Sequence, residues 1–96
     1  MARRILSAFK LINEFVKRNK YIEETDFFQR LRDEVEGAEI GDYSEGNFID
    51  IIYGDYIFTV YRVNGNWELS SRVELLAEDG NNASHINIDM TDAVMY

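Results

Sequence analysis

The sequence predicts an α+β fold in which two N-terminal helices pack on a four-stranded, mostly antiparallel β-meander. Apolar residues recur with helical spacing in the first third of the chain, and from residue 47 they alternate with polar residues as in strands. Asn64-Gly65 is the preferred pair for a two-residue hairpin turn. With 96 residues, of which 46% are hydrophobic, we expect one domain spanning residues 1–96 around one core.

The first helix is predicted over residues 2–19. Ile5, Phe9, Ile12 and Val16 follow one another at helical intervals and form an apolar stripe. Most of the basic residues lie off this stripe, and those near the end of the helix suit its dipole. We therefore expect this helix to cover one face of the sheet.

A second helix is predicted over residues 26–36, with Thr25 as its N-cap and Gly37 after its end. Residues 37–46 are predicted to form an acidic loop, because three glycines interrupt them and no Lys or Arg is present.

Strands are predicted over residues 47–53, 56–63, 66–76 and 84–90. Placing Asn64 and Gly65 in the turn pairs Val63 with Asn66. The same count pairs Arg62 with Trp67, Tyr61 with Glu68, Val60 with Leu69 and Phe58 with Ser71. A second turn at Gly54-Asp55 pairs Tyr53 with Tyr56, Ile51 with Phe58 and Ile49 with Val60.

This register gives the sheet two apolar faces rather than one. The inner face, which carries Phe58, Val60, Trp67 and Leu69, is expected to lie under the first helix. The opposite face carries an apolar strip made of Phe48, Ile52, Ile57, Tyr61 and Val63. An exposed apolar patch of this kind often marks a partner surface, so these residues are candidates for self-association as a homodimer.

The charge is acidic and unevenly distributed. The net charge is −8, with +4 over residues 1–32 and −12 over residues 33–96. An acid strip without intervening bases begins near the end of the second helix: Asp33, Glu34, Glu36, Glu39, Asp42 and Glu45. Glu78 and Asp79 form a second acidic loop. These eight residues are our candidate partner-binding residues, because such a surface repels nucleic acid and attracts a basic protein.

No catalytic chemistry is indicated by the sequence. There is no Cys, and the single His, His85, lies on the polar side of the last predicted strand. No phosphate-binding glycine motif and no metal-ligand spacing occurs, so we expect no catalytic residue, no metal and no cofactor. No apolar run approaches the ~20 residues needed to span a bilayer, and we expect no membrane partner and a cytoplasmic protein.

In size, α+β layout, lack of Cys, acidity and possession of the acid strip, the chain resembles the small anti-CRISPR and host-takeover proteins of phages. The resemblance implies a non-enzymatic inhibitor of a basic, nucleic-acid-binding protein or complex. Such an inhibitor acts by DNA mimicry or by steric block, in the host cytoplasm if the chain is phage-encoded. It assigns no individual residue, since no motif is shared.

Two other function classes remain open. One is a homo-oligomeric structural or interaction domain that uses the apolar strip. The other is a binder of nucleic acid or of a membrane surface through the basic first helix. We favour the acidic inhibitor, without direct contact to nucleic acid, over both.

Overall fold

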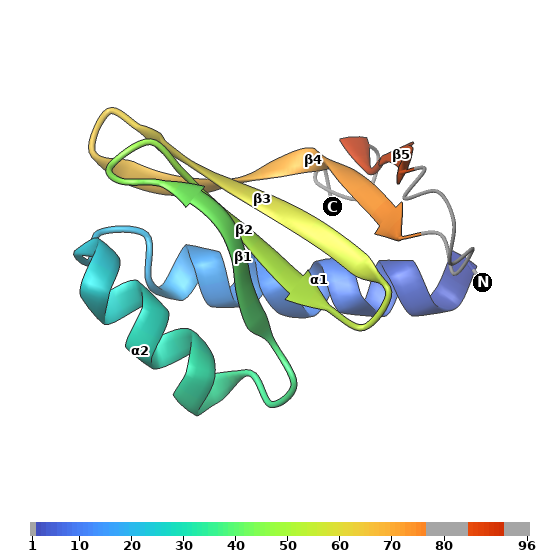
Figure 1. The fold of residues 1–96 in the computed structure, drawn as a ribbon, viewed down its shortest axis with the longest axis horizontal. Coiled ribbons are helices and arrows are strands. Elements are labelled where there is room, and N and C mark those ends of the chain that lie inside the picture. Colours follow the sequence, from blue (N-terminus) through green and yellow to red (C-terminus); the bar gives the residue numbers. More distant parts are fainter. Residues whose placement is uncertain (1, 77–84, 92–96) are drawn as a thin grey trace.

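A computed structural model gives the architecture of residues 2–76 and 85–91, with side chains described for residues 5–76 and 88–91. Two helices precede five strands in the chain: α1 (Ala2–Arg18), α2 (Glu24–Glu34), β1 (Glu39–Ser44), β2 (Phe48–Tyr53), β3 (Tyr56–Val63), β4 (Asn66–Leu76) and β5 (His85–Asp89). The strands form one antiparallel sheet in sequential order, and α1 runs along it (Figure 1). The predicted α+β fold is therefore confirmed.

Helix α1 covers the inner face of the sheet, as predicted. Its apolar stripe is fully or almost fully buried, and it joins the inner-face residues of β2, β3 and β4 in one hydrophobic core. The rings of Phe9 and Phe58 are 6.4 Å apart between centroids. Burial of this stripe, rather than helix propensity alone, holds α1 in place.

Helix α2 begins and ends about two residues earlier than predicted. Thr25 is not the N-cap, because it lies inside the helix and Glu23 precedes the first turn. The carbonyl of Glu23 accepts the Phe27 N–H at 2.8 Å. Phe27 and Leu31 bury the helix on the core, so tertiary packing rather than the cap residue decides where the helix starts.

The prediction of an acidic loop over residues 37–46 is wrong in part. Residues 39–44 form strand β1, a fifth strand at one edge of the sheet. Ile40 pairs with Ile51 and packs on the core, which offsets the cost of ordering a charged segment. A β-carbon on Gly41 would lie 3.1 Å from Ile52 Cδ1, so this glycine permits close packing of two strands.

Both predicted turns are confirmed. Asn64 and Gly65 have φ of 51° and 82°, and Gly54 in the other turn has φ of 63°. The pairs Val63–Asn66 and Tyr53–Tyr56 are those predicted.

The predicted pairing of β3 with β4 is wrong beyond Val60. Phe58 pairs with Val73 instead of Ser71, because three residues of β4 lie opposite Thr59 alone. Two residues are thus added to β4, and an even number leaves the inner face of the strand unchanged. Val73 is accordingly fully buried.

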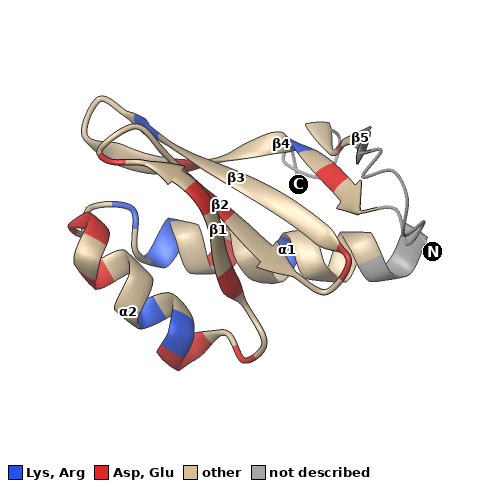
Figure 2. Ribbon diagram, viewed as in Figure 1, with Lys and Arg blue, Asp and Glu red and all other residues tan. Residues whose placement is uncertain are grey.

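The helix α1 and the sheet differ in charge. Among the residues whose side chains are described, α1 carries Lys10, Lys17 and Arg18 against one acid, Glu14, and Lys20 follows in the link to α2. The strands carry mostly Asp and Glu (Figure 2). Arg62, at the end of β3, is turned toward the helices, since its guanidinium donates to the Ile22 carbonyl at 3.0 Å and lies over the Trp67 ring. The sheet face opposite the helices, which we call the open face, is therefore poor in bases.

Candidate functional site

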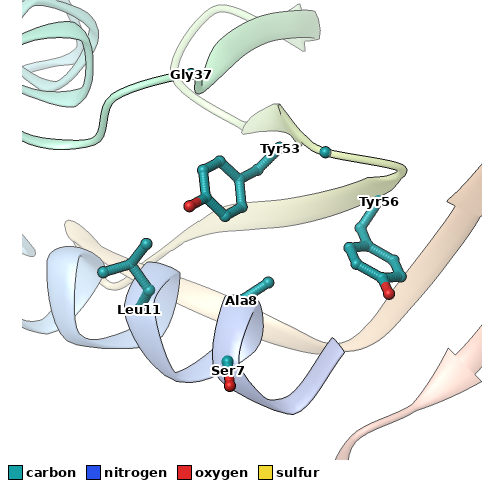
Figure 3. A pocket seen from close by; sticks show the side chains of 7 residues that line it. Ser7, Ala8, Leu11, Gly37, Tyr53 and Tyr56 are labelled. Atoms are coloured by element: carbon teal, nitrogen blue, oxygen red, sulfur yellow. The ribbon is translucent and has the colours of Figure 1, made fainter. Parts of the chain in front are cut away.

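A groove between α1 and the β2–β3 turn is the first candidate site (Figure 3). It has a volume of about 870 Å³ and is lined by Ser7, Ala8, Leu11, Gly37, Tyr53, Gly54 and Tyr56. This lining offers three hydroxyl groups and no carboxylate, imidazole, ammonium or guanidinium group. The groove thus offers a ligand apolar surface and hydroxyl groups, but no charged side chain.

The open face is the second candidate, and it begins with the apolar strip. Phe48 lies opposite Tyr61, and Ile52 lies opposite Ile57, so these side chains form cross-strand pairs on adjacent strands. Val63 extends the strip along β3.

None of the five side chains of the apolar strip belongs to the hydrophobic core or packs against it. Tyr61 and Val63 remain 45% and 40% exposed, and the others are half-buried. Among the described elements, no helix or strand covers the strip.

Strand β1 places part of the acid strip directly beside this apolar strip. Glu39 lies opposite Ile52. Gly41 and Asp42 together lie opposite Asp50, where β1 carries one extra residue as a bulge. Pairing of β1 with β2 thus joins two features that are separate in the sequence.

Asp50 is an addition to the site that sequence reasoning missed. Burial raises its pKa above the usual range; a hydrogen bond from Thr59 Oγ1 at 2.8 Å lowers it, and the charges of Glu74 and Asp42 raise it further. Asp50 alternates with Phe48 and Ile52 along β2, and this period-two pattern was the signal that places it on the open face.

Strands β4 and β5 extend the acidic character across the sheet. Glu68 lies opposite Tyr61, and Glu74 lies opposite Ile57. Asp89 lies opposite Arg72 on the adjacent strand, and Arg72 is the one basic residue among the described open-face positions. Hydrogen bonds from the Thr91 hydroxyl and N–H lower the pKa of Asp89.

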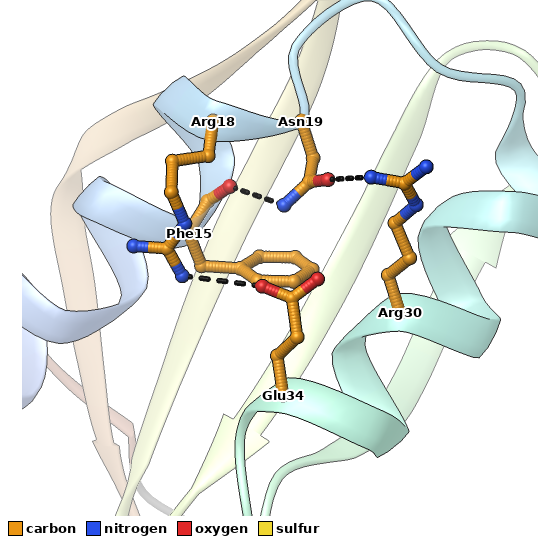
Figure 4. Close-up of polar contacts among 5 residues, drawn as sticks. All are labelled: Phe15, Arg18, Asn19, Arg30 and Glu34. Atoms are coloured by element: carbon orange, nitrogen blue, oxygen red, sulfur yellow. Dashed lines mark hydrogen bonds and ion pairs between the residues drawn. The ribbon is translucent and has the colours of Figure 1, made fainter.

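The remaining acids of the strip lie away from the open face, on α2 and the residues after it. Glu34 Oε1 accepts from Arg18 Nη2 at 3.2 Å, and this ion pair ties α2 to α1 (Figure 4). Asp33 accepts from Gln29 at 3.4 Å within the helix. Glu36 is exposed between α2 and β1.

The same junction holds a buried amide. The Asn19 side chain donates to the Phe15 carbonyl at 2.9 Å and accepts from Arg30 at 3.0 Å. Arg18 and Arg30 thus hold the two helices together.

The other predicted site residues have different outcomes. Glu45 is exposed in the β1–β2 turn, which is attached to α2 by a hydrogen bond from the Gly46 N–H to Glu24 at 3.0 Å. Glu78 and Asp79 lie outside the described residues. Within the described part of the chain, no group of three or more His, Asp or Glu side chains is arranged to hold a metal ion.

Fold and site together define a two-layer α+β domain with one acidic and partly apolar sheet face that no described helix or strand covers. Comparisons with known protein families, with curated proteins and with solved structures found no match. Among the described residues, no helix is both long enough and apolar enough to cross a membrane.

Proposed function

We propose that this protein is a non-catalytic binding domain whose open face docks on a basic surface of a nucleic-acid-handling protein and blocks it. One observation carries the proposal: the apolar strip and the carboxylates of β1, β2 and β4 lie together on a face that no described element covers.

The composition of the open face suits a protein partner. Stable interfaces combine an apolar, aromatic centre with a polar rim, and here Tyr61, Phe48 and Ile52 lie among carboxylates. The apolar centre contributes burial, while the carboxylates steer a basic partner and disfavour an acidic one. A nucleic acid would meet the same carboxylates and be repelled, so the proposed partner is a protein. A protein that binds nucleic acid presents the basic surface that these carboxylates attract.

Asp50 provides an energetic reason for a cationic partner. Its carboxylate is partly desolvated and lies near two other acids, which is unfavourable for the free protein. A Lys or Arg side chain placed against Asp50 and Asp42 relieves this repulsion. Binding of a cation and ionisation of Asp50 therefore favour each other.

The test compares two variants with equal change in charge. Glu39→Lys/Tyr61→Lys alters two exposed residues of the open face. Glu36→Lys/Tyr21→Lys alters an exposed acid and an exposed tyrosine elsewhere, and serves as the matched control. Each protein is immobilised and exposed to a bacterial cell lysate, the setting that the resemblance to phage inhibitors implies.

We expect wild type and control to retain the same nucleic-acid-binding protein, and the open-face variant to lose it. Duplex DNA or RNA should then displace the purified captured protein from the wild type. Equal retention by the open-face variant would show that another surface binds. A captured protein that holds nucleic acid and this domain at the same time would overturn inhibition by occupancy.

Binding to a membrane surface through α1 is not favoured by the structure. The apolar stripe of α1 is buried in the core, so the helix has no continuous apolar face left for lipid.

A further inference from the structure

The outward face of α1 is complementary to the open face of the sheet. Lys10 and Lys17 are exposed on it, two helical turns apart, and neither has an ion-pair partner among the described residues. Glu14 is exposed between them, one turn from each, so the three side chains together carry a net charge of +1. Leu6 is 37% exposed one turn before Lys10. This face is thus net positive with an apolar side chain at one end, whereas the open face combines anions with apolar side chains.

Charge decides how two copies can meet. In a two-fold symmetric dimer built on the open face, Glu39, Asp42 and Glu68 of one copy would face the same residues of the other, and like charges brought together disfavour association. A contact between the open face and the outward face of α1 pairs opposite charges and buries both sets of apolar side chains.

We propose that the protein self-associates head to tail, with the outward face of α1 of one copy docked on the open face of the next. The two faces lie on opposite sides of a two-layer domain, so one pair of molecules cannot satisfy both contacts. A heterologous contact of this kind forms a ring or an open chain rather than a closed dimer.

Self-association of this kind would hide the surface used under the proposed function. A copy docked on the open face competes with a basic partner for the same residues, so the partner releases monomers from the assembly. The inference itself depends only on the two faces of this chain and not on the identity of the partner.

The experiment uses one variant for each face. Leu6→Glu/Lys10→Glu alters only the outward face of α1, and Glu39→Lys/Tyr61→Lys alters only the open face. All four positions are exposed, and circular dichroism with thermal unfolding checks that both variants fold like wild type. Sedimentation equilibrium then measures the weight-average mass of wild type, of each variant and of their equimolar mixture.

We expect the mass of wild type to rise with concentration at low salt and to fall toward the monomer at 1 M salt, where the Debye length is about 3 Å. Each variant alone should remain a monomer. Their mixture should associate, because the intact open face of the first variant can dock on the intact outward face of α1 of the second.

Two outcomes would overturn the inference. One is a mixture that stays monomeric while wild type associates, since that indicates a symmetric or a different interface. The other is wild type that stays monomeric near 1 mM, a concentration at which any contact stronger than about 4 kcal/mol is populated. If wild type assembles head to tail but captures no partner from the lysate, only the proposed function is contradicted.

Discussion

At the scale of single residues, the Asn64-Gly65 turn is set by backbone conformation alone. Gly65 has φ of 82°, and nothing lies within 4 Å of the position that a β-carbon would occupy. Gly65→Val should therefore lower the free energy of unfolding by at least about 1 kcal/mol, the cost of a left-handed backbone for a residue with a β-carbon.

Chemical denaturation measures this loss, and Asn64→Gly is the control, because glycine accepts the same backbone conformation there. A loss below about 0.5 kcal/mol for Gly65→Val would contradict the assigned strain.

Asp50 gives a prediction about pH. Its pKa in the folded protein is raised above 3.8, so its ionisation disfavours the folded state at neutral pH, and this penalty disappears as pH falls through the folded-state pKa. Asp50→Asn keeps an acceptor for the Thr59 hydroxyl and removes the charge. The variant should be more stable than wild type at pH 7, by about 0.5 kcal/mol or less.

Paired denaturation curves at neutral and acidic pH test this sign. The difference between variant and wild type should vanish below pH 3.8, where both folded and unfolded Asp50 are protonated. A variant that is less stable than wild type at pH 7 would show that the carboxylate contributes a favourable interaction instead.

At the scale of elements, the strands with a strong turn signal were predictable, whereas β1, at one edge of the sheet, was not. Asn64-Gly65 and Gly54 define two hairpins, and alternation then fixes which face each side chain occupies. Strand β1 escaped prediction because its bulge breaks the alternation and its glycine and acids are typical of loops. Its position depends on pairing with β2, which no local pattern encodes.

The bulge of β4 and the start of α2 also lay beyond sequence reasoning, for related reasons. The segment around Ser71 has no residue that demands a bulge, and alternation cannot reveal it, because the two added residues leave the inner face of β4 unchanged. Thr25 has the chemistry of an N-cap, yet burial of Phe27 and Leu31 sets the start of the helix. For the helix, the core thus decides against a local preference.

The docking of α1 on the sheet yields a prediction of its own. Phe9 has no exposed surface and contacts Phe58, so Phe9→Ala should reduce the free energy of unfolding by roughly 3–5 kcal/mol through lost burial and a cavity. Leu11→Ala, at a position that is 41% exposed, should cost less than about 1 kcal/mol.

Thermal or denaturant unfolding of the two alanine variants side by side measures this difference. Equal and small losses in the free energy of unfolding would mean that α1 adds little to the core. The exposed cations of α1 would then favour a binding role for this helix.

At the scale of the whole molecule, the candidate site is an outcome of tertiary structure. The acid strip is continuous in sequence, but the fold divides it: Asp33, Glu34 and Glu36 lie with α2, whereas Glu39 and Asp42 lie on the open face. The apolar strip was predicted from alternation, yet its acidic surroundings on β1 could not be. The acid strip and the apolar strip, which the sequence predicts as two separate surfaces, therefore form one surface in part.

This division allows net charge to be separated from position. Glu39→Lys/Asp42→Lys and Asp33→Lys/Glu36→Lys change the net charge by the same amount, but only the first pair lies on the open face. At low salt the first variant should bind the captured partner at least about tenfold more weakly, a loss of about 1.4 kcal/mol, because steering and close pairing are both lost. The second should change the affinity by less than about threefold, since its charges remain outside the contact.

Titration calorimetry at low salt and at 1 M salt completes the comparison, because screening to a Debye length of about 3 Å should narrow the gap between wild type and the first variant. Denaturation curves for both variants exclude unfolding as the cause. If the two variants weaken binding equally, the partner responds to the total negative charge of the molecule. The open face would then have no special role, and the apolar strip would need a different explanation.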